Sequence, residues 1–124
     1  MQNKYKNRKI IAGGETFDSK KEYSRWAVLR MCERTGEIQN LRRQVPYELI
    51  PNICEPDKVG KRGGTIKGKV IERKVTYIAD FVYEQDGETI VEDVKGYRKG
   101  QAYAVFTLKR KLMLWRYGIK VKEI

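Results

Sequence analysis

Two runs of alternating apolar residues, 75–84 and 89–95, flank an Asp-Gly pair and leave few folds open other than a β-hairpin. Both faces of the first run are rich in apolar residues: Val75, Tyr77, Ala79, Phe81 and Tyr83 alternate with Thr76, Ile78, Asp80 and Val82. A strand of this kind is expected in the middle of a sheet. Asp86-Gly87 favours the tight turn that joins two antiparallel strands. The segment 75–95 therefore predicts two neighbouring central strands.

The second of these strands ends in charged residues, within the sequence VEDVKG. Because side chains alternate along a strand, Asp93 and Lys95 share a face while Glu92 points to the other. A tight turn brings Asp80, on the first strand, to the same end of the hairpin. Charges are costly to bury unless they are paired or bind a metal. The hairpin thus predicts two carboxylates and an ammonium group close together.

That trio of Asp80, Asp93 and Lys95 suits hydrolysis of a phosphodiester. Carboxylate oxygens are hard ligands that prefer Mg²⁺ or Mn²⁺, which acidify a bound water and neutralise charge growing on the phosphate. Lys95 can position the attacking water or help to deprotonate it. The backbone carbonyl of Val94 lies between the two side chains and is a further candidate ligand. The alternative is an ordinary Asp93–Lys95 ion pair on a solvated strand end, with Asp80 as a surface acid.

A helix is expected from Ser19 to about Thr35-Gly36, because the sequence SKKE at 19–22 has the pattern of a capping box. Glu22 shares its predicted face with Trp26 and Leu29. An acid on an apolar helix face is unusual. Two interpretations stay open, in which Glu22 either completes the helix cap or extends the metal site.

The remaining elements complete a single domain, 1–124, with a basic N-terminal arm at 1–14. A strand is expected at 45–50, a flexible basic loop or hairpin tip at about 55–74, and a short last strand at 119–121. A second helix follows the loop at 96–100, with Gly118 as its C-cap. Its expected core-facing stripe is Val105, Leu108, Leu112 and Trp115. The fold class is α/β leaning to α+β, with a mixed central sheet flanked by helices.

The charge balance points to a polyanionic partner. Lys and Arg number 27 against 16 Asp and Glu, a formal net charge of +11, and such an excess favours nucleic acid through neutralisation of phosphates. The chain has no histidine, and Cys32 and Cys54 lack metal-ligand spacing. A zinc site of Cys and His, and any mechanism with a histidine base, are therefore excluded. No signal peptide or membrane-spanning run is recognised, so we expect a cytoplasmic protein with no membrane partner.

Basic residues gather in two segments that are candidate DNA-binding surfaces. The segment 58–75 holds seven basic residues and four glycines, among them Lys61 and Arg62, and can lie along a phosphate backbone. The segment 95–122 holds nine basic residues and no acid. Within it Lys109, Arg110 and Lys111 lie off the expected apolar stripe and could face phosphates beside the site, although basic helix faces are often only solvated.

Taken together, these segments resemble the PD-(D/E)xK nuclease superfamily, and more closely its small phage and prophage endonucleases, which are similar to Holliday junction resolvases. The matching stretches are KYKNRKI, FDSKKEYSRW, GEIQNLRRQVPYELI, YIADFVY, VEDVKG and FTLKRKLMLWRYG, which cover most of the chain outside 51–74. FDSKKE followed by ADFVY and EDVKG is a fairly specific combination, whereas each piece alone is weak. Ala79 stands where the superfamily's name has a proline, although that proline is often absent.

The resemblance implies a restriction-endonuclease-like core in the order helix, three strands, helix, strand, and a Mg²⁺- or Mn²⁺-dependent DNA endonuclease. It implies Asp80, Asp93 and Lys95 as the catalytic trio with Glu22 as a helix-borne acid, while Gln44 matches a glutamine that helps to hold substrate or water. Branched DNA such as a Holliday junction, a role in phage replication or recombination, a bacterial host cytoplasm and a homodimer are further expectations.

Two other functions remain open at this point. The first is a non-catalytic nucleic-acid-binding protein that keeps the fold and the charge without the reaction, although it would have no physical reason to retain the trio. The second is a basic RNA-binding protein, which would present aromatic platforms for stacking bases. Tyr47, Tyr77, Tyr83 and Tyr103 leave that reading open, because they fall in elements that could belong to the core.

Overall fold

The computed structural model describes residues 9–124, so most of the arm expected at 1–14 lies outside the described residues. The elements are β1 (Ile10–Ala12), β2 (Glu15–Phe17), α1 (Lys20–Arg34), β3 (Gln39–Ile50), β4 (Ile53–Cys54), β5 (Lys58–Val59), β6 (Thr65–Ile66), β7 (Val70–Glu72), β8 (Val75–Gln85), β9 (Glu88–Asp93), α2 (Gly100–Tyr117) and β10 (Lys122–Glu123). No helix within 9–124 is long and apolar enough to cross a membrane.

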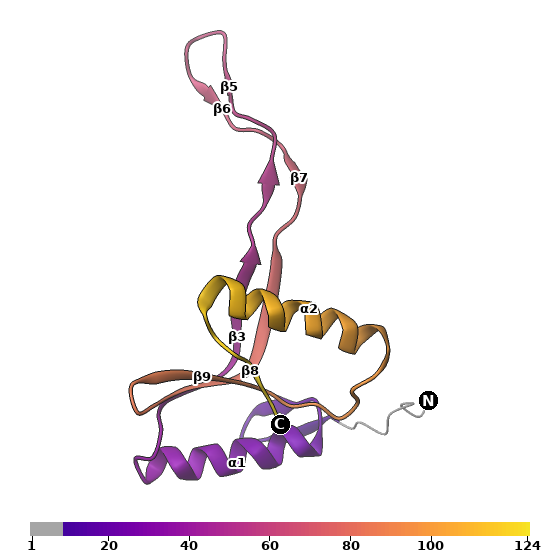
Figure 1. Cartoon of the computed structure of the whole chain (residues 1–124). Helices are drawn as coiled ribbons and strands as arrows, with labels where there is room; N and C mark the ends of the chain where they lie inside the picture. Colours follow the sequence, from indigo (N-terminus) through magenta and orange to yellow (C-terminus); the bar gives the residue numbers. More distant parts are fainter. Residues whose placement is uncertain (1–8) are drawn as a thin grey trace.

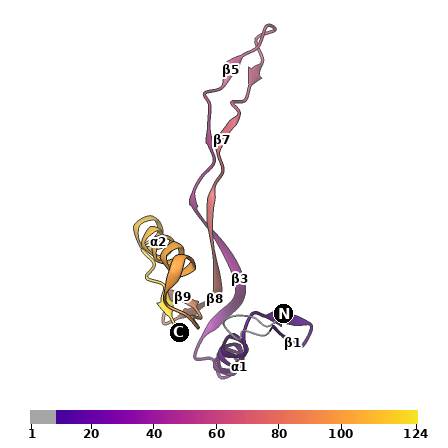
Figure 2. The ribbon, with the colours of Figure 1, turned by 90° about the vertical axis from the view of Figure 1, so that its right-hand side faces the viewer.

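A four-stranded mixed sheet forms the centre, in the order β10-β9-β8-β3. β9 runs antiparallel to β8, β8 antiparallel to β3, and β10 parallel to β9. Asp86 and Gly87 have φ values of 52° and 79°, as the predicted tight turn between β8 and β9 requires. The helices α1 and α2 lie on opposite sides of this sheet (Figures 1 and 2). The fold is therefore α+β, and its two helices and central sheet follow the predicted order of one helix, three strands, one helix and one strand, with the short strands β1, β2 and β4 to β7 outside this core.

The core divides into two clusters. The larger lies between the sheet and α2 and includes Leu49, Tyr77, Ala79, Val82, Val91, Phe106, Met113 and Val121. The smaller lies against α1 and contains Leu29, Ile38, Phe81 and Tyr83. The expectation that residues 77, 79, 81 and 83 pack on one face is therefore wrong beyond Ala79. The change of face falls at Asp80, between Ala79 and Phe81, and Gln44 opposite it on the paired strand β3 has a left-handed φ of 52°.

The apolar stripe predicted for α2 is confirmed at Leu112, which packs against the core, and is wrong at its other three residues. Val105, Leu108 and Trp115 are 53%, 59% and 79% exposed, whereas Phe106 and Met113 are buried against the sheet. Both sets match helical spacing, because apolar residues lie around much of the circumference of α2, and periodicity alone cannot choose between them. Gly118 does cap the helix, with φ 68°. The last strand begins one residue after the predicted segment 119–121.

A two-stranded arm projects from the body where β3 and β8 continue past the sheet (Figures 1 and 2). β4 pairs with β7 and β5 with β6, so the segment expected as a basic loop at 55–74 is the paired ribbon of a hairpin. Gly68 lies so close to the opposite strand that a Cβ atom there would be 1.6 Å from the carbonyl oxygen of Glu55. β3 begins at Gln39, six residues before the predicted strand, because its polar first half still pairs with β8.

Candidate active site

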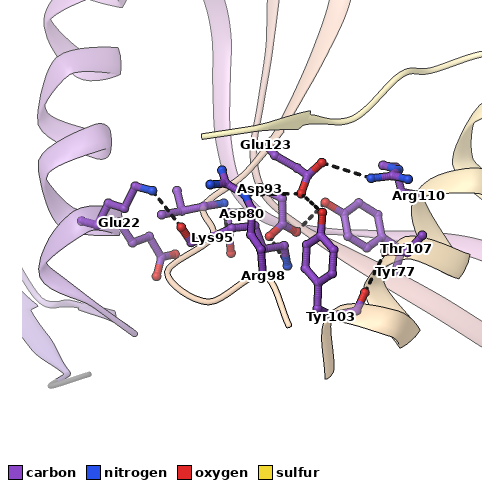
Figure 3. Close-up of polar contacts among 12 residues, drawn as sticks. Glu22, Tyr77, Asp80, Asp93, Lys95, Arg98, Tyr103, Thr107, Arg110 and Glu123 are labelled. Carbon is purple, nitrogen blue, oxygen red and sulfur yellow. Dashed lines mark hydrogen bonds and ion pairs between the residues drawn. The ribbon is translucent and has the colours of Figure 1, made fainter. Parts of the chain in front are cut away.

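A cleft of about 530 Å³ opens between the start of α1, the middle of β8 and the end of β9. Its volume falls in the range of small-molecule sites, which is enough for a phosphodiester with bound water. It is lined by Ile10, Asp18, Ser19, Lys20, Lys21, Glu22, Asp80, Asp93, Val94, Lys95 and Gly96. The cleft therefore brings together the hairpin trio and the helix-borne acid, which come from three separate elements (Figure 3).

Asp93 and Lys95 form the ion pair at the end of β9. Lys95 Nζ lies 2.8 Å from Asp93 Oδ1, and the Tyr77 hydroxyl donates a 2.7 Å hydrogen bond to Asp93 Oδ2. Burial, and then the adjacent Asp93 charge, raise the pKa of Tyr77, so this hydroxyl stays a donor. Lys95 Nζ also lies 3.5 Å from the centre of the Phe106 ring. Both charged side chains are thus held in place, although the pair remains open to the cleft.

The carboxyl group of Asp80 has a pKa that departs from its ordinary value. The Val94 amide donates to its Oδ2 over 2.8 Å, and Gln44 Nε2 donates to its Oδ1 over 3.2 Å. Burial and then the negative charges of Asp93 and Glu22 together raise the pKa of Asp80 to about 7, against the lowering effect of those two hydrogen bonds. The cleft therefore concentrates more negative charge than its own donors neutralise.

Glu22 serves the helix cap and the cleft at once, because its two carboxylate oxygens have different partners. Ser19 Oγ accepts from the Glu22 amide over 3.1 Å, as predicted for the N-cap. Glu22 Oε2 accepts from the amide of Asp18, one residue before the predicted partner, over 2.9 Å. Oε1 accepts from Gln44 Nε2 over 3.2 Å. The two roles that the sequence left as alternatives are therefore compatible.

A buried ion pair joins α1 to β9 beside the cleft. Arg25 donates through Nε and Nη2 to the two oxygens of Glu92, each over 2.7 Å, and the Tyr83 hydroxyl donates to the same carboxylate. Glu92 is 1% exposed. Arg25 follows Glu22 by one helical turn, so this contact fixes the helix that carries Glu22. The sequence placed Glu92 on the opposite face from Asp93 but gave no signal for its partner.

A divalent cation is the group that this chemistry implies, and its fit can be judged from the side chains. As they lie, no three Asp, Glu or Cys side chains within 9–124 converge as a ready-made metal cage. Mg²⁺, however, keeps several waters and is commonly held by one or two carboxylates. Asp80, Asp93 and Glu22 offer only oxygen atoms, and their mutual repulsion at Asp80 is what a cation would relieve. The residues fit a hydrated Mg²⁺ or Mn²⁺.

Residues 2–123 match a protein family described as "Protein of unknown function (DUF1064)". The chain belongs to this family. No curated protein matches the chain, and no solved structure does. The family description names no activity, and the side chains of the cleft are what indicate its role in this DUF1064 protein.

The predicted DNA-binding residues fall in different places. Lys109 lies in a groove that also contains Asp93 and Lys95, whereas Arg110 is paired with Glu123 over 3.1 Å (Figure 3). Lys111 is exposed. Consecutive helix residues point about 100° apart, so these three side chains do not share one face, and their contact with phosphates stays a prediction. Lys61 and Arg62 are exposed in the turn at the tip of the arm (Figure 1).

Three further residues of the site were not singled out from the sequence. Tyr77, which the sequence leaves open between a core residue and a stacking platform, is buried in the core, and its hydroxyl reaches Asp93. Lys21 donates to the backbone carbonyl of Lys95 over 2.7 Å and lines the cleft. Arg43 lies 3.5 Å from Glu22 Oε1 and 3.8 Å above the Phe17 ring. The available signals were the basic pair beside Glu22 and the basic residue beside Gln44.

Proposed function

We propose that this protein is a metal-dependent DNA endonuclease of the PD-(D/E)xK type. The observation that carries the proposal is the meeting of Asp80, Asp93 and Glu22 with Lys95 in one open cleft. Structural ion pairs tend to neutralise one another, but here the pKa of Asp80 is raised to about 7 by burial and by the two other acids. An excess of carboxylates beside a lysine is the arrangement expected of a site that binds a cation and a phosphate.

Each side chain has a role that follows from its position. Asp80 and Asp93 would hold the cation, with Glu22 as the third acid. The backbone carbonyl of Val94, which also lines the cleft, would be a further metal ligand. A bound Mg²⁺ or Mn²⁺ supplies Lewis-acid charge to the phosphate and acidifies water. Lys95, 2.8 Å from Asp93, is placed to stabilise negative charge on the phosphate and to orient the attacking water.

Two supporting residues would set the geometry of the reaction. Gln44 donates to both Glu22 and Asp80 and so keeps these acids beside each other, with its own amide exposed for substrate or water. Tyr77 fixes Asp93 through its hydroxyl. Positions held in this way lower the reorganisation needed in the transition state, which is where enzymes gain most of their rate.

DNA is the proposed substrate because the net charge is +11, an excess that favours a polyanion, and because the cleft itself is lined by lysines as well as acids. Lys20 and Lys21 line the cleft, whereas Lys61 and Arg62 lie in the turn between β5 and β6, at the far end of the arm (Figure 1). A projecting basic ribbon can contact a second segment of DNA while the cleft holds the first. Branched DNA, such as a four-way junction, is therefore the substrate we expect to be preferred.

The direct test is cleavage of end-labelled four-way junction, flap, duplex and single-stranded DNA by the purified protein. We expect cleavage with Mg²⁺ or Mn²⁺, none with excess EDTA, and recovery when the metal is restored, because the proposed ligands are all oxygen atoms. Undiminished cleavage in EDTA would rule out the proposed chemistry. Binding of the same DNA without cleavage under every metal condition would instead favour a non-catalytic nucleic-acid-binding protein.

A further inference from the structure

A second groove meets the cleft at the Asp93–Lys95 pair. These two residues line both hollows. The second groove continues between the start of β8 and the first half of α2, where it is lined by Thr76, Tyr77, Ile78, Val105, Phe106 and Lys109. A polymer lying in the cleft thus has a continuous path past the proposed reacting residues and out along α2.

Lys109 supplies the available positive charge in this groove. Its other charged side chains are Asp93 and Lys95, which are paired with each other. Within the part of the chain that the structure describes, Lys109 makes no ion pair, and the segment 95–122 around it contains no acid. A half-buried lysine without an acidic partner, beside a phosphodiester site, is suited to hold a phosphate.

The walls of the groove are apolar on both sides. Ile78 on β8 and Val105 on α2 are each 53% exposed, although both are large apolar side chains. Leu108 is equally exposed at 59% and lies on the same helix, but it is not part of the groove. A pair of apolar walls with one lysine matches a nucleotide unit, which has an uncharged sugar next to a charged phosphate.

We propose that this groove binds the nucleotide adjacent to the scissile phosphate, with Lys109 on its phosphate and Ile78 and Val105 against its sugar. The inference rests on the proposed nuclease function. It gives the scissile strand a path through the protein. The strand would pass Lys20 and Lys21 in the cleft, then Asp93 and Lys95, and leave along Lys109. It also assigns Lys109 a function that its neighbours Arg110 and Lys111 do not share.

The test compares Lys109→Ala with Lys120→Ala, which removes the same charge from an exposed lysine of the same basic segment that lines neither the cleft nor the groove. On labelled single-stranded and duplex DNA with Mg²⁺, Lys109→Ala should lower kcat/KM about tenfold, mainly through KM. The log–log salt slope of metal-free binding should fall by about 0.9 on duplex and about 0.7 on single strands, as expected for one lost phosphate contact. Lys120→Ala should change neither quantity.

A second arm of the test locates the phosphate. On DNA in which single phosphates are replaced by neutral methylphosphonates, the wild type should lose cleavage at the modified position and at one immediate neighbour. In Lys109→Ala, a methylphosphonate at that neighbouring position should no longer reduce cleavage. Val105→Ala should raise KM without changing the salt slope, whereas Leu108→Ala should leave KM unchanged.

The outcomes separate the groove from the nuclease proposal. If the protein cleaves DNA and Lys109→Ala behaves like Lys120→Ala, the proposal for the groove is wrong and the nuclease proposal stands. If the protein binds DNA without cleaving it, the nuclease proposal falls, and the salt slopes of the two variants alone decide whether Lys109 contacts a phosphate. If neither DNA is bound, both proposals fail.

Discussion

Gln44 holds two acids together with a single amide group, since its Nε2 lies 3.2 Å from both Glu22 and Asp80. Its backbone has a φ of 52°, a left-handed conformation that few non-glycine residues adopt. Such a conformation costs about 1–3 kcal/mol and persists where the surroundings impose it, often at functional sites. The strain at Gln44 is therefore consistent with a residue placed for the cleft.

Glu22→Gln separates the role of this residue in the helix cap from its role in the cleft. The amide oxygen of glutamine can still accept from the Asp18 backbone, so the thermal midpoint should change by no more than a few degrees. Cleavage should fall at least tenfold, because the third acid is lost. Glu88→Gln, at an exposed acid beside the β8–β9 turn, is the matched control for stability and rate. Full activity in Glu22→Gln would leave Glu22 as a cap alone.

Asp80 should make the stability of the metal-free protein depend on pH. Its folded-state pKa of about 7 lies above the ordinary value of 3.8, so the folded state holds this proton more tightly than the unfolded chain. The resulting stabilisation is complete below about pH 4 and is lost as pH rises through 7. Between these values this residue should lower the free energy of unfolding with a slope approaching about 1.4 kcal/mol per pH unit.

Asparagine at position 80 has no proton to lose, so the stability of Asp80→Asn should not fall in this way. Relative to the wild type, the variant should therefore become more stable from pH 4 to pH 8. Urea titrations in EDTA at several pH values measure that difference. Excess Mg²⁺ should restore much of the stability of the wild type at pH 8 and none in the variant. Parallel pH profiles for the two proteins would contradict the account of charge in the cleft.

At the scale of the elements, the Arg25–Glu92 pair is expected to stabilise the fold, whereas the arm is expected to contribute to binding. The bidentate pair ties α1 to β9 behind the cleft, and removing one partner of such a buried pair typically costs about 3–5 kcal/mol. The arm has few contacts with the body, and nearly every residue of it is exposed. The body should therefore determine stability, while the arm contributes mainly to binding.

Gly68→Ala tests the arm without touching the cleft. A Cβ atom at this position would overlap the Glu55 carbonyl, so the ribbon has to open or change register. The thermal midpoint of the body should be unchanged, whereas affinity for a four-way junction should fall and its salt slope should flatten as Lys61 and Arg62 lose their placement. Gly64→Ala is the matched control, because a Cβ there meets nothing within 4 Å. Equal binding by both variants would remove the arm from the DNA interface.

At the scale of the whole molecule, the sequence predicted the element order, both helix caps, the β8–β9 turn and the residues that meet at the cleft. These features depend on local rules of capping, turn chemistry and strand alternation. The buried face of α2 was wrong because Val105, Leu108 and Trp115 fit helical spacing as well as Phe106 and Met113 do. Which of them is buried depends on where β3 and β8 lie, and periodicity does not contain that information.

The sequence allowed a hairpin tip at about 55–74, but the length of the paired arm and the partners of the basic residues were beyond prediction for a related reason. Glycine-rich and lysine-rich segments are typical of flexible loops, and the close contact at Gly68 appears only once the two strands cross. Arg110 could not be separated from Lys109 and Lys111 until Glu123, from the last strand, was placed beside it. Such contacts connect distant segments, and composition gives no signal for them.

The central claim is that Asp93 belongs to a reaction centre, and Asp93→Asn tests it most directly. Asparagine keeps the shape of the side chain, and its amide oxygen can still accept from Tyr77, so circular dichroism and metal-free DNA binding should match the wild type. The matched control is Asp86→Asn in the exposed β8–β9 turn, where asparagine tolerates the φ of 52°. With Mg²⁺ and labelled four-way junction, single-turnover cleavage by Asp93→Asn should fall at least about 100-fold, or about 2.7 kcal/mol of transition-state stabilisation, while Asp86→Asn stays at the wild-type rate. Cleavage by Asp93→Asn at the rate of Asp86→Asn would contradict the claim.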